Sequence, residues 1–182
     1  MEMTKKEQRQ LFWNVSLTGY EKKVLKEAGF FLPEQMINIP VVYLVQLEYF
    51  GFQYTVDVLR ALYWYLELPE ESVDETIEEL IVDYNEFRID DEYDPDYLSG
   101  KSEIQIAISE MLYAIGYDSK KKISEITIIE LLQIPGVNDT SLEFVAEEII
   151  RSYYSTYVVP SCTYRTRDDF KLNGALLFKT LK

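Results

Sequence analysis

The sequence has 182 residues, of which 32 are Asp or Glu and 18 are Lys or Arg, so its formal net charge is −14 at pH 7. It contains no histidine and a single cysteine, Cys162. This composition excludes nucleophiles activated by histidine, histidine-ligated metals, thiolate zinc clusters and an intramolecular disulfide. With 47% apolar and 14% aromatic residues but only seven Gly and six Pro, the chain has the composition of a globular protein made of helices joined by short loops.

A membrane-spanning helix needs an apolar run of about 18 residues or more. No run in this sequence is that long, because the best candidate, 37–52, is interrupted by Pro40, Gln46 and Glu48. Residues 1–10 are charged, and no apolar region follows them as it would in a signal peptide. The lone cysteine is typical of a reducing compartment. We therefore expect a cytoplasmic protein that does not contact a membrane.

In the N-terminal third we expect two short helices. Residues 4–13 are compatible with a short basic helix. Thr18 and Glu21 have the spacing of a capping box, in which each residue satisfies a backbone N–H of the other, and Gly29 stands where a left-handed residue would end the helix.

The next segment is strongly apolar. Pro33 is predicted to open a helix, and residues 41–50 are apolar nearly all round, which indicates a helix through the core that ends at Gly51. Thr55 or Asp57 is predicted to cap the helix that follows.

The C-terminal half is predicted to be mostly helical as well. Apolar residues recur with helical spacing in four segments, 102–115, 124–132, 142–153 and 170–181. β-Branched and aromatic residues near 155–167 favour a small β-hairpin. We therefore predict one all-α domain over residues 1–182 with about seven to nine helices, and the alternative is a subdivision at an acidic loop over 90–100.

Negative charge is concentrated in residues 67–96, here called the acidic stretch, which hold fourteen carboxylates and one base, Arg88. Ile77, Leu80 and Ile81 lie on one apolar face of a predicted amphipathic helix whose outer face is acidic, and the acidic loop follows it. The candidate partner-binding residues are these carboxylates: Glu71, Asp74, Glu75, Glu78, Glu79, Asp83, Glu86, Asp90, Asp91, Glu92, Asp94 and Asp96.

Two interpretations of the acidic stretch stand side by side. In one it is a solvated helix face and loop, which is what most charged runs are. In the other its carboxylates, spaced along a helix that rises about 1.5 Å per residue, imitate duplex phosphates, which carry one charge per about 1.7 Å of axis. Because concentrated like charge destabilises a compact chain, the second interpretation gives this charge a use.

The same segment also has part of a calcium-loop pattern. Glu92, Asp94, Asp96 and Glu103 fall at positions 1, 3, 5 and 12 of an EF-hand register, where oxygen ligands belong. Position 1 is Glu rather than Asp, and Tyr97 stands where the loop needs glycine for its sharp turn. A cation site here is the alternative to a solvated loop.

Two further segments carry signals for nucleic acid. Residues 131–149 resemble one helix-hairpin-helix unit, a motif that binds DNA backbone, but Asn138 stands where a second glycine is usual, and Asp139 and Glu143 repel phosphate. We predict a structural corner in which Gly136 permits the turn. A basic loop is predicted at Lys120, Lys121 and Lys122, where direct contact with nucleic acid is the alternative to a solvated turn.

These observations favour a non-enzymatic acidic protein that binds a basic, nucleic-acid-handling protein and needs no cofactor. The alternatives from other classes are a metal-dependent nuclease that uses carboxylates and a structural or regulatory helical subunit. In size, acidity and tyrosine content, with 15 Tyr, the chain resembles the small anti-defence proteins of phages and mobile elements, in particular type II anti-CRISPR proteins. The resemblance implies inhibition of an RNA-guided nuclease and assigns no residue roles.

Overall fold

The computed structural model describes residues 4–66, 77, 79–81 and 95–157, with the side chains of its longest helix described from Glu103 onward. Within these ranges the chain is helical, and the β-pairing there is an isolated antiparallel bridge between Pro40 and Thr127. The prediction of an all-α fold is confirmed. The α-helices are α1 (Lys5–Leu11), α2 (Gly19–Glu27), α3 (Val41–Val45), α4 (Gly51–Tyr65), α6 (Pro95–Ala114), α7 (Lys120–Ser124), α8 (Ile128–Leu132) and α9 (Leu142–Tyr157).

Helices α1 and α2 begin at matching capping boxes. Thr4 and Glu7 satisfy each other's backbone N–H groups at the start of α1, and Thr18 and Glu21 do the same at the start of α2, as predicted. Between them, the π-helical segment η1 (Phe12–Ser16) buries Phe12. After α2, Gly29 has a φ of 93°, which confirms the predicted left-handed end of the helix.

The apolar segment 41–50 is divided where one continuous helix was predicted. Pro33 opens only the short 3-10 turn η2 (Pro33–Gln35), and α3 ends after five residues. Tyr49 and Gly51 then adopt φ values of 59° and 69°, which turn the chain so that α4 starts at Gly51. The prediction that Gly51 ends a helix is wrong, because its left-handed conformation precedes a helix here rather than following one.

Helix α4 also corrects the predicted cap at Thr55 or Asp57. Both residues lie inside the helix, where the Thr55 hydroxyl donates to the carbonyl of Gly51, four residues earlier, at 2.8 Å. Thr55 is fully buried, and this bond satisfies its hydroxyl without a cap.

Helix α6 begins at Pro95, within the segment predicted to be an acidic loop over 90–100 and before the predicted start at Ser102. Proline blocks a helix that arrives from its N-terminal side, but at the first helical position its missing N–H has no partner to lose. Pro95 therefore starts a helix, and the predicted loop is wrong from residue 95 onward. Residues 90–94 lie outside the described part of the chain.

The predicted basic loop and the two helices after it are also revised. Lys120, Lys121 and Lys122 form the first turn of α7, which Ser119 caps by accepting from the Lys122 N–H. The predicted helix 124–132 is replaced by the end of α7 and a separate α8, because the chain between them pairs with Pro40. In the predicted hairpin, residues 155–157 belong to α9, while 158–167 and the predicted terminal helix lie outside the described residues.

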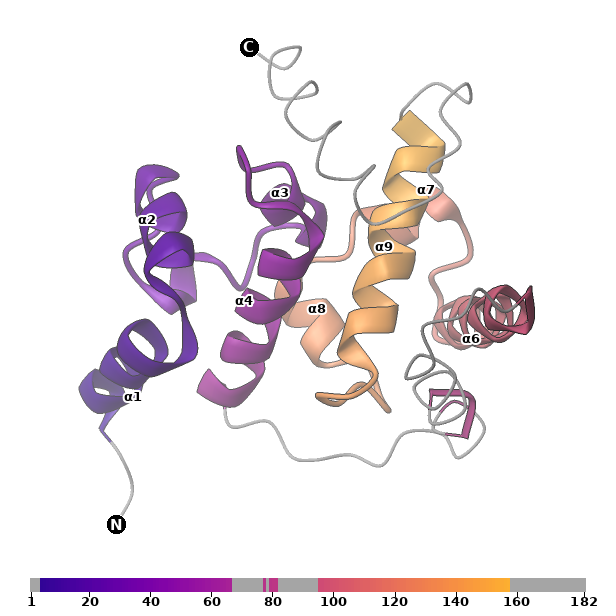
Figure 1. The fold of residues 1–182 in the computed structure, drawn as a ribbon, viewed down its shortest axis with the longest axis horizontal. Coiled ribbons are helices and arrows are strands. Elements are labelled where there is room, and N and C mark those ends of the chain that lie inside the picture. The colour runs from indigo at the N-terminus through magenta and orange to yellow at the C-terminus, as the bar shows by residue number, and fades with distance from the viewer. Residues whose placement is uncertain (1–3, 67–76, 78, 82–94, 158–182) are drawn as a thin grey trace.

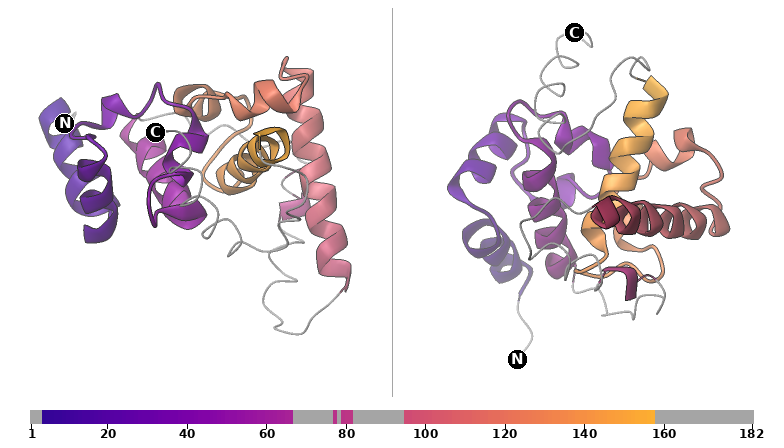
Figure 2. Two further views of the ribbon diagram at one scale, coloured as in Figure 1. Left: turned by 90° about the horizontal axis from the view of Figure 1, so that it is seen from above. Right: turned by 45° about the vertical axis from the view of Figure 1, so that its right-hand side comes forward.

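Helix α9 lies at the centre of the fold, in contact with α3, α4, α6, α7 and α8 (Figure 1). Helices α1 and α2 lie on the far side of α4 from α9, and the long α6 forms the opposite edge of the molecule (Figure 2). One hydrophobic cluster includes side chains from both halves of the sequence. The buried residues include Val41, Leu44, Leu47, Leu62, Ile108, Leu112 and Ile149, while Leu80, on the predicted apolar face of the acidic stretch, is half-buried.

Among the described residues, no helix combines the length and the apolar character that crossing a membrane requires.

Candidate functional site

The structure describes the inner side of one helical turn in the acidic stretch. Ile77 and Ile81 are 5% and 1% exposed and belong to the hydrophobic core, whereas Glu79 is exposed. This confirms the predicted phase of the apolar face at these positions: the isoleucines point inward and Glu79 points to solvent.

The other predicted partner-binding residues are divided between α6 and the undescribed part of the chain. Asp96 lies in the first turn of α6. The remaining residues lie outside the described ranges: Glu71, Asp74, Glu75, Glu78, Asp83, Glu86, Asp90, Asp91, Glu92 and Asp94.

The calcium-loop interpretation does not fit α6. Asp96 and Glu103, the proposed positions 5 and 12, lie in one continuous helix, where seven residues span about 10.5 Å of axis. An EF-hand needs the chain between these positions to wrap around the ion. The register is therefore wrong. Within the described ranges, no group of three or more His, Cys, Asp or Glu side chains is arranged to hold a metal ion.

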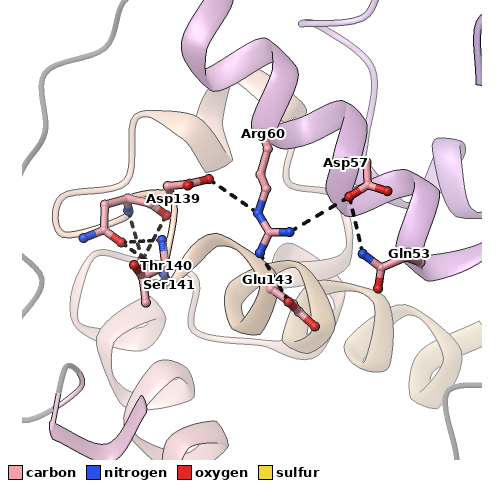
Figure 3. Close-up of polar contacts among 8 residues, drawn as sticks. Gln53, Asp57, Arg60, Asp139, Thr140, Ser141 and Glu143 are labelled. Carbon is pink, nitrogen blue, oxygen red and sulfur yellow. Dashed lines mark hydrogen bonds and ion pairs between the residues drawn. The ribbon is translucent and has the colours of Figure 1, made fainter. Parts of the chain in front are cut away.

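A charged cluster around Arg60 joins α4 to the start of α9 (Figure 3). The guanidinium lies 3.4 Å from Asp139 Oδ1, 3.3 Å from Glu143 Oε2 and 4.0 Å from Asp57 Oδ1. The Gln53 side-chain amide also donates to Asp57 Oδ1, at 3.3 Å. Sequence reasoning missed this cluster because Arg60 and Glu143 lie 83 residues apart in the chain.

The turn between α8 and α9 uses its polar groups internally. Gly136 has a φ of 83°, as a corner made by glycine requires. Asn138 Oδ1 accepts from the backbone N–H groups of Thr140 and Ser141, at 2.9 and 3.0 Å, and Ser141 Oγ accepts from the N–H of Asn138 at 2.9 Å. These three N–H groups therefore donate within the turn, and Asp139 binds Arg60. The geometry is that of the predicted structural corner.

The side chains of Lys120, Lys121 and Lys122 are exposed on α7. The ammonium of Lys122 lies 2.9 Å from Asp118 Oδ1, an ion pair between residues four apart. Direct contact of these lysines with nucleic acid stays the alternative to a solvated surface.

A second ionic cluster, missed by sequence reasoning, ties α1 to η2 and α4. Arg9 donates two hydrogen bonds to Glu34 Oε1, at 2.9 and 2.7 Å, and the Tyr65 hydroxyl donates to the same oxygen at 2.7 Å. Burial raises the pKa of Glu34, but the hydrogen bonds from Arg9 and Tyr65 outweigh it and lower the pKa to about 2. Glu34 is therefore an ionised structural residue at neutral pH.

Glu148 is a buried carboxyl group between α6 and α9. It is 8% exposed, and it accepts from the hydroxyls of Ser109 and Ser152 at 3.0 and 3.5 Å. Burial raises its pKa, and the hydrogen bond from Ser109 opposes the shift. The burial of Glu148 could have been predicted from the sequence, because Glu148 follows the apolar Val145 by three residues and so lies on the buried face of α9.

Comparison with protein-family models, with curated proteins and with solved structures gives no match to this chain. The functional argument therefore rests on the charges and contacts of its own residues.

Proposed function

We propose that the protein is a non-enzymatic binding protein whose acidic stretch binds a basic, nucleic-acid-handling surface on another protein. The observation that carries this proposal is the distribution of charge. Residues 67–96 hold fourteen carboxylates and one base, a charge of −13, so that the other 152 residues account for only −1 of the total of −14. A surface with such a local excess attracts a partner of opposite sign.

The described part of the acidic stretch supports the proposal because it is attached to the hydrophobic core. Burial of Ile77 and Ile81 holds one helical turn on the core, while Glu79 remains in solvent. A turn fixed in this way keeps its carboxylate in place before a partner arrives, and less conformational entropy is lost on binding.

Three carboxylates outside the acidic stretch give a useful contrast. Glu34, Asp139 and Glu143 each lie close to an arginine of the same chain. In the acidic stretch only Arg88 is available for fourteen carboxylates, so most of this charge has no base nearby in the sequence. The unmatched charge costs stability through like-charge repulsion, and a basic partner would offset that cost.

The resemblance in size and composition to type II anti-CRISPR proteins nominates a guide-loaded type II RNA-guided nuclease as the first partner to test. Such a nuclease holds nucleic acid in a positively charged channel, which fits a surface that imitates phosphates.

The experiment is capture of the guide-loaded nuclease on immobilised full-length protein, followed by elution with target DNA or with salt. We expect capture at low ionic strength, release by target duplex and release by salt, since exposed charges are screened beyond about 8 Å at physiological ionic strength. Capture that resists both DNA and salt would show that another surface binds. With no capture of the nuclease, the same column loaded with host lysate identifies the basic protein that the proposal requires.

A further inference from the structure

A hollow of about 290 Å³ lies between η1, the start of α2 and the middle of α4, outside the acidic stretch. We call it the Trp64 hollow. The residues that decide its chemistry are Thr18, Glu21, Asp57, Arg60 and Trp64.

Glu21 places a buried carboxylate in the wall of this hollow. The side chain is 1% exposed, and its Oε2 accepts from the backbone N–H of Thr18 at 2.5 Å as part of the capping box. Its other oxygen, Oε1, is also buried and accepts no hydrogen bond from the described residues. A buried carboxylate oxygen left without a donor is costly, and a cation that reaches it relieves this cost.

The local charge favours a cation over an anion. Arg60 also lines the hollow, but its guanidinium is already in contact with Asp57, Asp139 and Glu143. The hollow itself is lined by two carboxylates, Glu21 and Asp57, and by this one guanidinium, whose charge is also shared with Asp139 and Glu143. A further positive group would lower the excess negative charge, whereas an anion would increase it.

Trp64 supplies a flat aromatic surface at the same place. Its side chain is 56% exposed, unusual for a tryptophan held on a helix, and its ring meets that of Tyr63 edge to face. An adjoining hollow shares Ser16, Ala61 and Trp64 and is also lined by Leu11, which is 44% exposed. An indole face stabilises a cation placed over it, and the neighbouring leucine can cover an aliphatic stem.

We propose that the Trp64 hollow binds one arginine side chain of a basic partner, whose guanidinium stacks on Trp64 and donates to Glu21 Oε1. Arginine fits better than lysine because its guanidinium is planar, stacks on aromatic rings and is more weakly hydrated than an ammonium group. The inference goes beyond the proposed function, since it adds a specific contact outside the acidic stretch, and it stands whether or not that stretch binds.

The test is an NMR titration of the full-length, 15N-labelled protein with the peptide acetyl-Gly-Arg-Gly-amide. Binding is monitored through the chemical shift of the Thr18 backbone amide. We expect a saturable shift. The same peptide with citrulline, a neutral isostere of arginine, should produce none. Glu21→Gln keeps an oxygen for the Thr18 N–H, as glutamine does in capping boxes, and should raise the Kd at least about fivefold.

Two further variants separate the hollow from general charge and from misfolding. Glu27→Gln changes the net charge by the same amount on an exposed position of α2 and should leave the Kd within about twofold. Trp64→Ala removes an exposed side chain, so the fold should persist while binding is lost. The inference would be overturned if the Glu21 and Glu27 variants had equal effects, or if the citrulline peptide bound equally well. It would also be overturned if no saturable shift appeared, which is the result for a hollow that holds only water. Replacing Glu75, Glu78 and Glu79 by Gln should leave this Kd unchanged, which separates it from the acidic stretch.

Discussion

The contact between Arg9 and Glu34 should make part of the stability of this protein depend on acidic pH. Glu34 Oε1 accepts from both Arg9 and Tyr65, which belong to different helices, so the carboxylate joins three elements of the N-terminal half. Its pKa falls from 4.5 to about 2. Because the folded-state pKa is depressed, the contact contributes fully above about pH 4.5 and is lost as the pH falls through about 2.

The size of the effect follows from that shift. A change from 4.5 to about 2 corresponds to an upper bound of about 3.4 kcal/mol, at about 1.36 kcal/mol per pKa unit. The side chains of Arg9 and Glu34 are 40% and 32% exposed, so solvent screens part of this interaction. We therefore expect the coupling between Arg9 and Glu34 to contribute about 1 kcal/mol at neutral pH.

The assay is a double-mutant cycle with Arg9→Met, Glu34→Gln and the double variant, each unfolded with urea over a range of pH. The cycle cancels the general effect of acid on a chain of this net charge, because all four proteins share it. The coupling free energy should be largest above about pH 4.5 and shrink toward about pH 2. A coupling that is negligible at neutral pH, or that stays constant across this window, would refute the reasoning.

Three other substitutions test the fold. Gly136→Val places a β-branched residue at a φ of 83° and should cost about 1–3 kcal/mol in urea unfolding, with an unchanged midpoint contradicting a structural role for the corner. Arg60→Ala removes the guanidinium that lies beside Asp139 and Glu143 and should lower the free energy of unfolding by about 1–2 kcal/mol, and a more stable variant would contradict this. Ile81→Ala should cost about 2–4 kcal/mol because the side chain is 1% exposed, whereas a cost under about 0.5 kcal/mol would show that the acidic stretch is not anchored there.

Some helix ends could be predicted because residues close in the sequence determine them. Thr18 and Glu21 contact each other within one turn of α2, so their spacing alone predicts the start of that helix. Gly29 likewise has the positive φ that a glycine after a helix indicates.

Prediction failed where distant parts of the chain decide the local conformation. The N–H groups of Ile128 and Ile129 donate to the carbonyls of Ile39 and Ile37, at 2.9 and 2.7 Å, while Val41 N–H donates to Ile126 at 3.0 Å. This pairing holds the chain before α8 out of a helix, so α7 and α8 are separate although the spacing of apolar residues over 124–132 is helical. No pattern within residues 124–132 reveals a partner near residue 40.

The candidate site likewise has one part that the sequence predicts and another part that it does not. The phase of Ile77, Glu79 and Ile81 follows from helical periodicity and was predicted correctly. The Arg60 cluster and the Trp64 hollow depend on how α4 packs against the start of α9 and of α2, so only the folded chain brings their members together.

The most direct test of the central claim measures the rate at which the protein associates with its basic partner, with the guide-loaded type II nuclease first. The variant Glu75→Gln, Glu78→Gln, Glu79→Gln is compared with Glu27→Gln, Glu48→Gln, Glu125→Gln, which replaces exposed carboxylates elsewhere, so that both change the net charge from −14 to −11. If the acidic stretch steers the encounter, the first variant should associate about tenfold more slowly at low salt, the control should change by less than about twofold, and high salt should remove the difference. Equal association rates for the two variants at low salt would contradict the claim and place the binding surface elsewhere.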